Sequence, residues 1–109
     1  EQDGRVWLVK RPGTGMLGGM RALPDDGWSA QRDGSGRAPL HGSWDEAGTV
    51  RHTFTHFTVE LAVVRYRESA VQLIGEGEWW PIDRLDEAGL PTLFAKAASL
   101  ARAAQERLL

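Results

Sequence analysis

The stretch that decides the fold class runs from Phe57 to Val64 and has the sequence FTVELAVV. One face of this stretch carries the large apolar side chains of Phe57, Val59, Leu61 and Val63. The other face carries Thr58, Glu60, Ala62 and Val64. Because side chains alternate between the two faces of a β-strand, this period of two predicts a half-buried strand within residues 50–67. The polar and β-branched residues 51–56 form either the edge of that strand or a short loop between two strands.

Towards the N-terminus, the sequence predicts a second strand and a loop. The pair Asp3-Gly4 precedes the sequence RVWLVKR at residues 5–11, and an Asp-Gly pair before a strand is a strong hairpin signal. We therefore expect a strand at residues 5–11 and a first strand cut off before the turn. Residues 11–20 contain four glycines and one proline, which predicts a loop. Their spacing matches neither a phosphate-binding P-loop nor a dinucleotide-binding fingerprint.

Towards the C-terminus, the sequence predicts a short strand and then helical segments. The sequence EWWPI at residues 78–82 favours a strand whose pairing ends at Pro81. A short helical turn at residues 84–88 follows, and Pro91 suits the first position of a final helix. That helix has an apolar stripe made of Leu93, Ala97, Leu100 and Ala104. A further short helical turn is expected at residues 43–47. Strands, loops and then a helix indicate an α+β fold.

Composition limits the class of protein. The chain has 109 residues, of which 41% are hydrophobic, which suits a single domain with one core. It has no cysteine, which excludes a disulfide scaffold, a thiolate metal site and a cysteine nucleophile. No apolar run approaches about 20 residues, so no membrane partner is expected. The sequence does not begin with Met, so we expect a fragment, and a cytoplasmic location is the default. Because the formal net charge is −2, nucleic-acid binding would need a local basic face.

Three blocks of sequence carry a resemblance to a known family. The first comprises RVWLVKRP at residues 5–12 and TGMLGGM at residues 14–20 and ends at Leu23-Pro24; the second is VRHTFTHF at residues 50–57. The third runs from WWP at residues 79–81 to GLPTLF at residues 89–94. Together, and in this order, they resemble the C-terminal domain of bacterial MutY-type adenine DNA glycosylases. The resemblance implies one Nudix-like domain over residues 1–109, with a mixed β-sheet, packed helices and a missing first strand.

The resemblance also implies a function in base-excision repair. This domain of the family recognises 8-oxoguanine opposite adenine in double-stranded DNA, and a separate N-terminal helical domain excises the adenine. That catalytic domain holds a 4Fe-4S cluster, which requires four cysteine ligands. Since this chain has no cysteine, we expect neither the cluster nor any catalysis in it. The expected partners are duplex DNA containing 8-oxoguanine opposite adenine and the N-terminal catalytic domain.

Nudix hydrolases suggest an alternative function, cleavage of oxidised nucleotides. Such enzymes place several glutamates of one helix around Mg²⁺. Counted from Gly18, the first position that requires glutamate holds Pro24, and Glu46 is the only glutamate among residues 25–49. The pattern is absent, so no metal site is predicted. A protein-interaction module that uses an exposed sheet edge is a third possibility.

The resemblance places lesion recognition at Phe54, Thr55 and His56. 8-Oxoguanine carries N7–H as a donor where guanine has an acceptor, so a protein that distinguishes them presents an acceptor there. The Thr55 hydroxyl both donates and accepts, and it is assigned to the N7/O8 edge. Phe54 would insert beside the lesion as an apolar wedge, and His56 would orient the loop or contact a phosphate. Without the resemblance, Phe54 would be interpreted as a core residue.

Four basic residues are candidates for contacts to the DNA backbone. They are Arg51, Lys10, Arg11 and Arg21. Phosphate contacts of this kind position a protein on DNA without reading its sequence. Solvated surface charge explains each of the four equally well. His52 is expected to form a hydrogen bond within the fold, because no third ligand lies near enough in the sequence for it and His56 to bind zinc.

Overall fold

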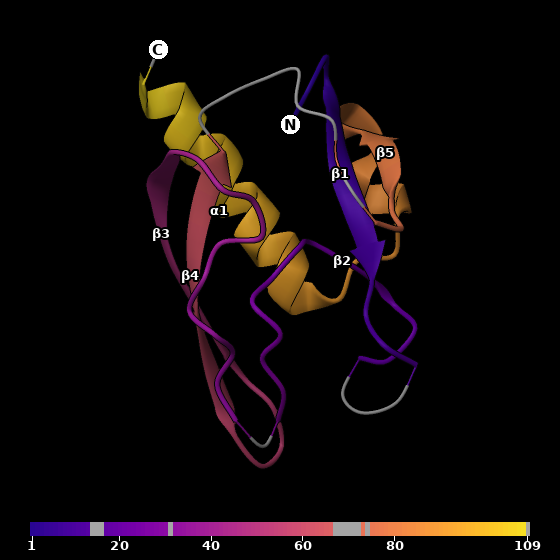
Figure 1. The fold of residues 1–109 in the computed structure, drawn as a ribbon, viewed down its shortest axis with the longest axis vertical. Helices are drawn as coiled ribbons and strands as arrows, with labels where there is room; N and C mark the ends of the chain where they lie inside the picture. Colours follow the sequence, from indigo (N-terminus) through magenta and orange to yellow (C-terminus); the bar gives the residue numbers. More distant parts are fainter. Residues whose placement is uncertain (14–16, 31, 67–72, 74, 109) are drawn as a thin grey trace. The chain divides into compact units, whose positions relative to one another are not determined.

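A computed structural model of the chain describes residues 1–13, 17–30, 32–66, 73 and 75–108 (Figure 1). Its elements are β1 (Arg5–Lys10), β2 (Arg21–Ala22), β3 (Trp44–Thr53), β4 (Thr58–Tyr66), β5 (Glu78–Pro81), the 3-10 helix η1 (Ile82–Glu87) and α1 (Thr92–Leu108). The chain divides into two compact units. Unit 1 consists of Glu1–His41 and Ser69–Pro91, and unit 2 consists of Gly42–Glu68 and Thr92–Leu109.

Unit 1 contains a three-stranded antiparallel sheet with β1 at its centre. The strand order is β2-β1-β5. Residues 5–8 of β1 pair with β5 in a register that joins Arg5 to Pro81 and Leu8 to Glu78. Residues 9 and 10 pair with the two residues of β2. Leu8 is fully buried, which is consistent with the central position of β1.

The predicted Asp-Gly turn is confirmed at the start of β1. Asp3 and Gly4 have φ values of 53° and 75°, and two-residue hairpin turns of type I′ require positive φ at both central positions. Gln2 and Arg5 exchange both backbone hydrogen bonds across the turn, at 2.8 and 3.0 Å. Glycine adopts this conformation without a steric cost, and this explains why Gly4 follows the aspartate.

Aromatic contacts hold β1 and β5 together beyond their backbone pairing. Trp7 and Trp79 face each other across the strands, with ring centroids 5.3 Å apart in an edge-to-face arrangement. Trp80 Nε1 donates to the carbonyl oxygen of Arg84 at 2.7 Å, which ties β5 to η1. The expected strand at residues 78–82 and the helical turn at residues 84–88 are therefore present, with η1 beginning slightly earlier at Ile82.

Unit 2 contains a long antiparallel hairpin formed by β3 and β4. The pairs run from Trp44 with Tyr66 to Thr53 with Thr58. The register shifts between Glu46 and Gly48, so Ala47 is the extra residue of a β-bulge. The prediction of a helical turn at residues 43–47 was wrong. Pairing with β4 makes these residues the start of a strand, because tertiary context overrides weak local propensity.

The two faces of the hairpin differ in exposure. Its outer face carries side chains that are all exposed, those of Thr49, Arg51, Thr53, Thr58, Glu60, Ala62 and Val64. The inner face includes Val50 and Val63, which are 7% and 8% exposed. The alternation found in the sequence is therefore confirmed in β4. The sequence did not decide whether residues 51–53 continue the strand of residues 57–64 or precede it. They belong to a separate strand, β3.

Helix α1 packs against the hairpin of unit 2, mainly against β3 (Figure 1). Its buried residues are Leu93, Phe94, Ala97, Ala98 and Ala104, which include most of the predicted apolar stripe. Gly48 allows a close approach, since a Cβ there would lie 3.0 Å from Leu100 Cδ2. Gly48 also has φ of +136°, which side chains rarely adopt. The bulge therefore requires glycine at the point where α1 meets β3.

The predicted α+β class is confirmed. The described strands form two sheets in which every pairing is antiparallel, and a helix packs on one of them. Among the described residues, no helix is long and apolar enough to span a membrane.

Candidate nucleic-acid interface

The predicted recognition residues lie together at the turn that joins β3 to β4. We call residues 52–58 the hairpin tip. Phe54 N donates to the Phe57 carbonyl oxygen at 2.8 Å and closes the turn around Thr55 and His56. The side chains of Thr55 and His56 are exposed, and within the described parts of the chain neither has a hydrogen-bond partner. The Thr55 hydroxyl is thus accessible to a ligand.

A cluster of three rings supports the hairpin tip. Phe54 and Phe57 stack with centroids 5.1 Å apart and planes inclined by 24°. The His52 ring meets Phe54 edge-on at 4.8 Å. All three rings are half-buried. Phe54 is therefore packed against protein rings, and its insertion into DNA would replace a contact with Phe57 by a contact with a base.

Two threonines fasten the strands next to the turn. Thr53 Oγ1 and Thr58 Oγ1 lie 3.1 Å apart on the outer face and share one hydrogen bond. Cross-strand threonine pairs of this kind stabilise antiparallel sheets. The bond holds the ends of β3 and β4 together and so limits the movement of the turn that carries Thr55.

The tip is connected to α1 through His52. Lys96 Nζ lies 3.1 Å from His52 Nδ1, and both residues belong to unit 2. The expectation that His52 forms a hydrogen bond within the fold is confirmed. Arg51 lies on the outer face, exposed and opposite Glu60 in the register. Cationic side chains therefore stand near both faces of the tip.

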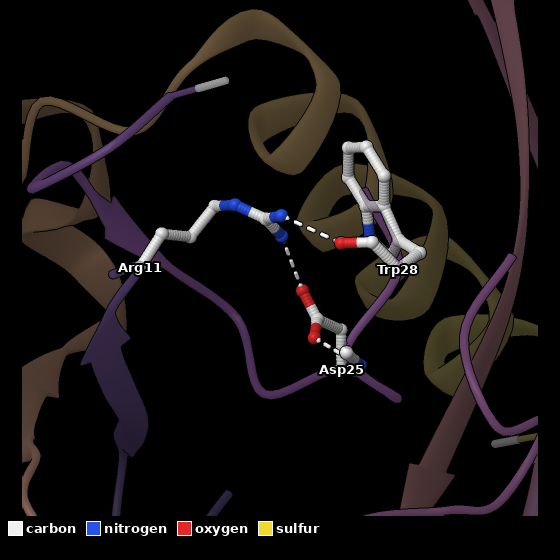
Figure 2. A network of polar contacts seen from close by, with 4 residues as sticks. Arg11, Asp25 and Trp28 are labelled. Carbon is white, nitrogen blue, oxygen red and sulfur yellow. Dashed lines mark hydrogen bonds and ion pairs between the residues drawn. The ribbon is translucent and has the colours of Figure 1, made fainter. Parts of the chain in front are cut away.

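Arg11 is held inside unit 1 by a polar network (Figure 2). Its Nη1 donates to Asp25 Oδ2 at 2.7 Å and its Nη2 donates to the Trp28 carbonyl oxygen at 2.8 Å. The guanidinium carbon lies 4.3 Å from the centre of the Trp28 ring. Asp25 Oδ1 accepts from Gly27 N at 2.8 Å, so the carboxylate also fixes the loop. Only 10% of the Arg11 side chain is exposed, which limits its access to a phosphate.

Arg21 also has partners within unit 1. Its Nε pairs with Glu78 Oε1 at 2.7 Å, and its Nη1 donates to the Ala88 carbonyl oxygen at 3.0 Å. The guanidinium lies over the Trp80 ring at 4.6 Å. Its side chain is 34% exposed. Lys10, by contrast, is exposed at the end of β1. Phosphate contacts by Lys10, Arg11, Arg21 and Arg51 stay predictions. Because Arg11 and Arg21 already have partners within the protein, Lys10 and Arg51 are the better candidates.

Two residues were not among the sequence candidates: Phe57, which belongs to the hairpin tip, and Lys96 of α1, which contacts its His52. Phe57 was counted as a strand residue, although its distance of three positions from Phe54 is typical of residues that flank a tight turn. Lys96 carried no signal, because its position beside His52 depends on how α1 packs against β3.

The segment between β2 and β3 bears on metal chemistry. Residues 23–30 and 32–43, which the structure describes, contain no helix. Among the described residues, no group of three or more histidine, aspartate or glutamate side chains is arranged to hold a metal ion. Glu46, the glutamate nearest to the expected acidic pattern, lies in β3. The residues present do not fit the metal site of a Nudix hydrolase.

Comparison with known families agrees with the architecture. The sequence matches the NUDIX domain over residues 1–100. Since the match covers nearly the whole chain, the chain belongs to the NUDIX domain family. Among curated proteins, no relative matches it.

Proposed function

We propose that this chain is the lesion-recognition domain of a MutY-type adenine DNA glycosylase, which recognises 8-oxoguanine opposite adenine in duplex DNA. The excision of adenine belongs to a separate catalytic domain. This chain has no cysteine for the iron–sulfur cluster of that domain. The observation that carries the proposal is the exposed Thr55 hydroxyl at the turn of a hairpin, next to Phe54 and Phe57, whose rings stack on each other.

The chemistry of the tip fits the oxidised base. The Thr55 oxygen accepts a hydrogen bond from N7–H of 8-oxoguanine, and guanine offers no donor at this atom. The flat faces of Phe54 and Phe57 suit stacking against a base, which is worth about 1–3 kcal/mol per base. His56 is exposed beside Thr55, which supports its proposed role in orienting the loop or contacting a phosphate.

The family membership alone would equally allow a hydrolase of oxidised nucleotides. That alternative is weaker, because residues 25–49 contain a single glutamate and their described part lacks the helix that would carry the metal ligands. Binding of a damaged base requires no such ligands. In the proposed function, the domain therefore binds an oxidised guanine base within DNA and does not hydrolyse a free oxidised nucleotide.

The proposal is tested by the binding of the 109-residue chain to two duplexes at low salt. The duplexes differ only in 8-oxoguanine or guanine opposite adenine, and fluorescence anisotropy gives both dissociation constants. We expect tighter binding to the oxidised duplex. Thr55→Val, which replaces the hydroxyl by a methyl group, should remove most of this preference. The loss of one hydrogen bond corresponds to a factor of about 3–10.

Thr49→Val is the matched control. Thr49 is an exposed threonine in the middle of β3 and pairs with Ala62, away from the tip. This variant should keep the preference for the oxidised duplex, because its hydroxyl is far from the turn. Equal binding to both duplexes by the unmodified chain, or an equal loss in the two variants, would contradict the assignment of Thr55.

A further inference from the structure

Lys96 differs from the arginines of the chain that have charged partners. Arg11, Arg21 and Arg84 are each paired with a carboxylate at 2.7–2.8 Å. Lys96 is exposed, and its ammonium lies 3.1 Å from the ring nitrogen Nδ1 of His52. Within the described residues no carboxylate pairs with it. No carboxylate of the described residues therefore neutralises its charge.

The hydrogen bond fixes the roles of the two side chains. An ammonium group has three donors and no acceptor, so His52 Nδ1 must accept. With Lys96 as the donor to Nδ1, the tautomer that fits this bond is the one with its proton on Nε2. This bond uses one of the three N–H groups of the ammonium. Two donors and a full positive charge are left for an anion.

The position of this ammonium relates it to the hairpin tip. His52 contacts Phe54 at 4.8 Å, and Phe54 stacks on Phe57 at 5.1 Å. Lys96 therefore lies beside the three contacting rings of the hairpin tip. Flat apolar rings next to an unneutralised cation match the chemistry of a nucleotide, which combines a planar base with a phosphate. Glu60, the acidic residue of the adjoining strand, lies on the outer face and does not compete for Lys96.

We propose that Lys96 holds a backbone phosphate of DNA next to the base engaged by the hairpin tip, and that His52 is the positioning residue for its ammonium. The inference rests on the proposed function, because it takes the tip to be the part that contacts DNA. It adds a contact from α1, an element that the lesion assignment does not use. Lys96 on the side of α1 and Arg51 on the outer face would then contact the DNA backbone at two points.

The test measures how the affinity for duplex DNA depends on salt. Each phosphate contact contributes about −0.9 to the slope of log K against log salt concentration. Lys96→Gln should make the slope of the 109-residue chain less steep by about 0.9. Lys96→Arg, which keeps the charge, should keep the slope. Arg102→Gln removes the same charge from an exposed position further along α1 and should leave the slope unchanged.

A second variant tests the role of His52. His52→Phe keeps an aromatic ring against Phe54 and removes the acceptor for Lys96. We expect the affinity to fall by about 3–10-fold, the value of one hydrogen bond, while the slope is kept because the lysine is still present. A merely structural role of His52 would instead lower the melting temperature without this combination of effects.

The outcomes separate this inference from the proposed function. If Lys96→Gln and Arg102→Gln give the slope of the unmodified chain while Thr55→Val still removes the preference for 8-oxoguanine, the phosphate contact is overturned and lesion recognition stands. If the slope becomes less steep in Lys96→Gln alone, but the unmodified chain binds the 8-oxoguanine and guanine duplexes equally, the phosphate contact stands and lesion recognition is overturned. A chain that binds neither duplex at low salt overturns both.

Discussion

Replacing Asp25 with alanine is expected to lower the free energy of unfolding by about 3–5 kcal/mol, because it leaves a nearly buried charge without its partner. Arg11 and Asp25 are 10% and 19% exposed, and their closest atoms are 2.7 Å apart. Arg11 Nε already lacks a hydrogen-bond partner among the described residues. Removal of the carboxylate would also release Gly27 N, so the loop that carries Trp28 would lose an anchor.

Urea denaturation followed by tryptophan fluorescence measures this loss. Glu87→Ala is the control, since Arg84 and Glu87 form an ion pair of 2.8 Å whose side chains are 65% and 54% exposed. This exposed pair should contribute only about 0–1 kcal/mol, because water screens it. Replacing both partners of the part-buried pair, as Arg11→Met with Asp25→Leu, should restore most of the stability. A loss for Asp25→Ala no larger than that for Glu87→Ala would contradict the argument.

The same ion pair shows why some candidates could not be evaluated from the sequence. Arg11 lies 14 positions from Asp25, and Arg21 lies 57 positions from Glu78. Nothing in the local sequence distinguishes these arginines from Arg51, which has no ion pair among the described residues. Pairing over such distances depends on the tertiary fold. The sequence therefore offers four basic candidates, but it could not show which of them carboxylates of the protein neutralise.

The secondary structure was predictable where one face of an element is buried. Period-two alternation predicted β4, and the apolar stripe predicted α1, because both elements bury one face. The turn between β3 and β4 was one of two alternatives for residues 51–56, and the sequence could not decide between them, since Thr55-His56 lacks the glycine or asparagine that usually marks a tight hairpin. The resemblance of residues 50–57 to a known family predicted a recognition role for Phe54, Thr55 and His56, and that role stays a prediction. Lys96 was missed because a charge on an exposed helix face has many equivalent positions.

The second largest loss of stability is expected for Gly77→Ala, because the backbone of Gly77 lies directly against the Trp7 ring. A Cβ at this position would be 2.4 Å from Trp7 Cε2 and Cζ2 and 2.6 Å from Nε1. Carbon atoms in contact are normally about 3.5–4.0 Å apart, so the ring or the backbone must shift. Trp7 cannot move without disturbing its edge-to-face contact with Trp79 at 5.3 Å.

We therefore expect Gly77→Ala to lower the free energy of unfolding by about 1–3 kcal/mol, the usual cost of overpacking. Gly13→Ala is the matched control, because a Cβ there meets nothing within 4 Å and neither glycine has a positive φ. Any gain from a stiffer unfolded chain is common to both variants, so the difference between their urea midpoints isolates the clash. The near-ultraviolet circular dichroism of the Trp7–Trp79 pair should also change in Gly77→Ala alone. Equal midpoints and unchanged spectra would show that the ring is not held against Gly77, and the contact between β1 and the residues before β5 would then need another explanation.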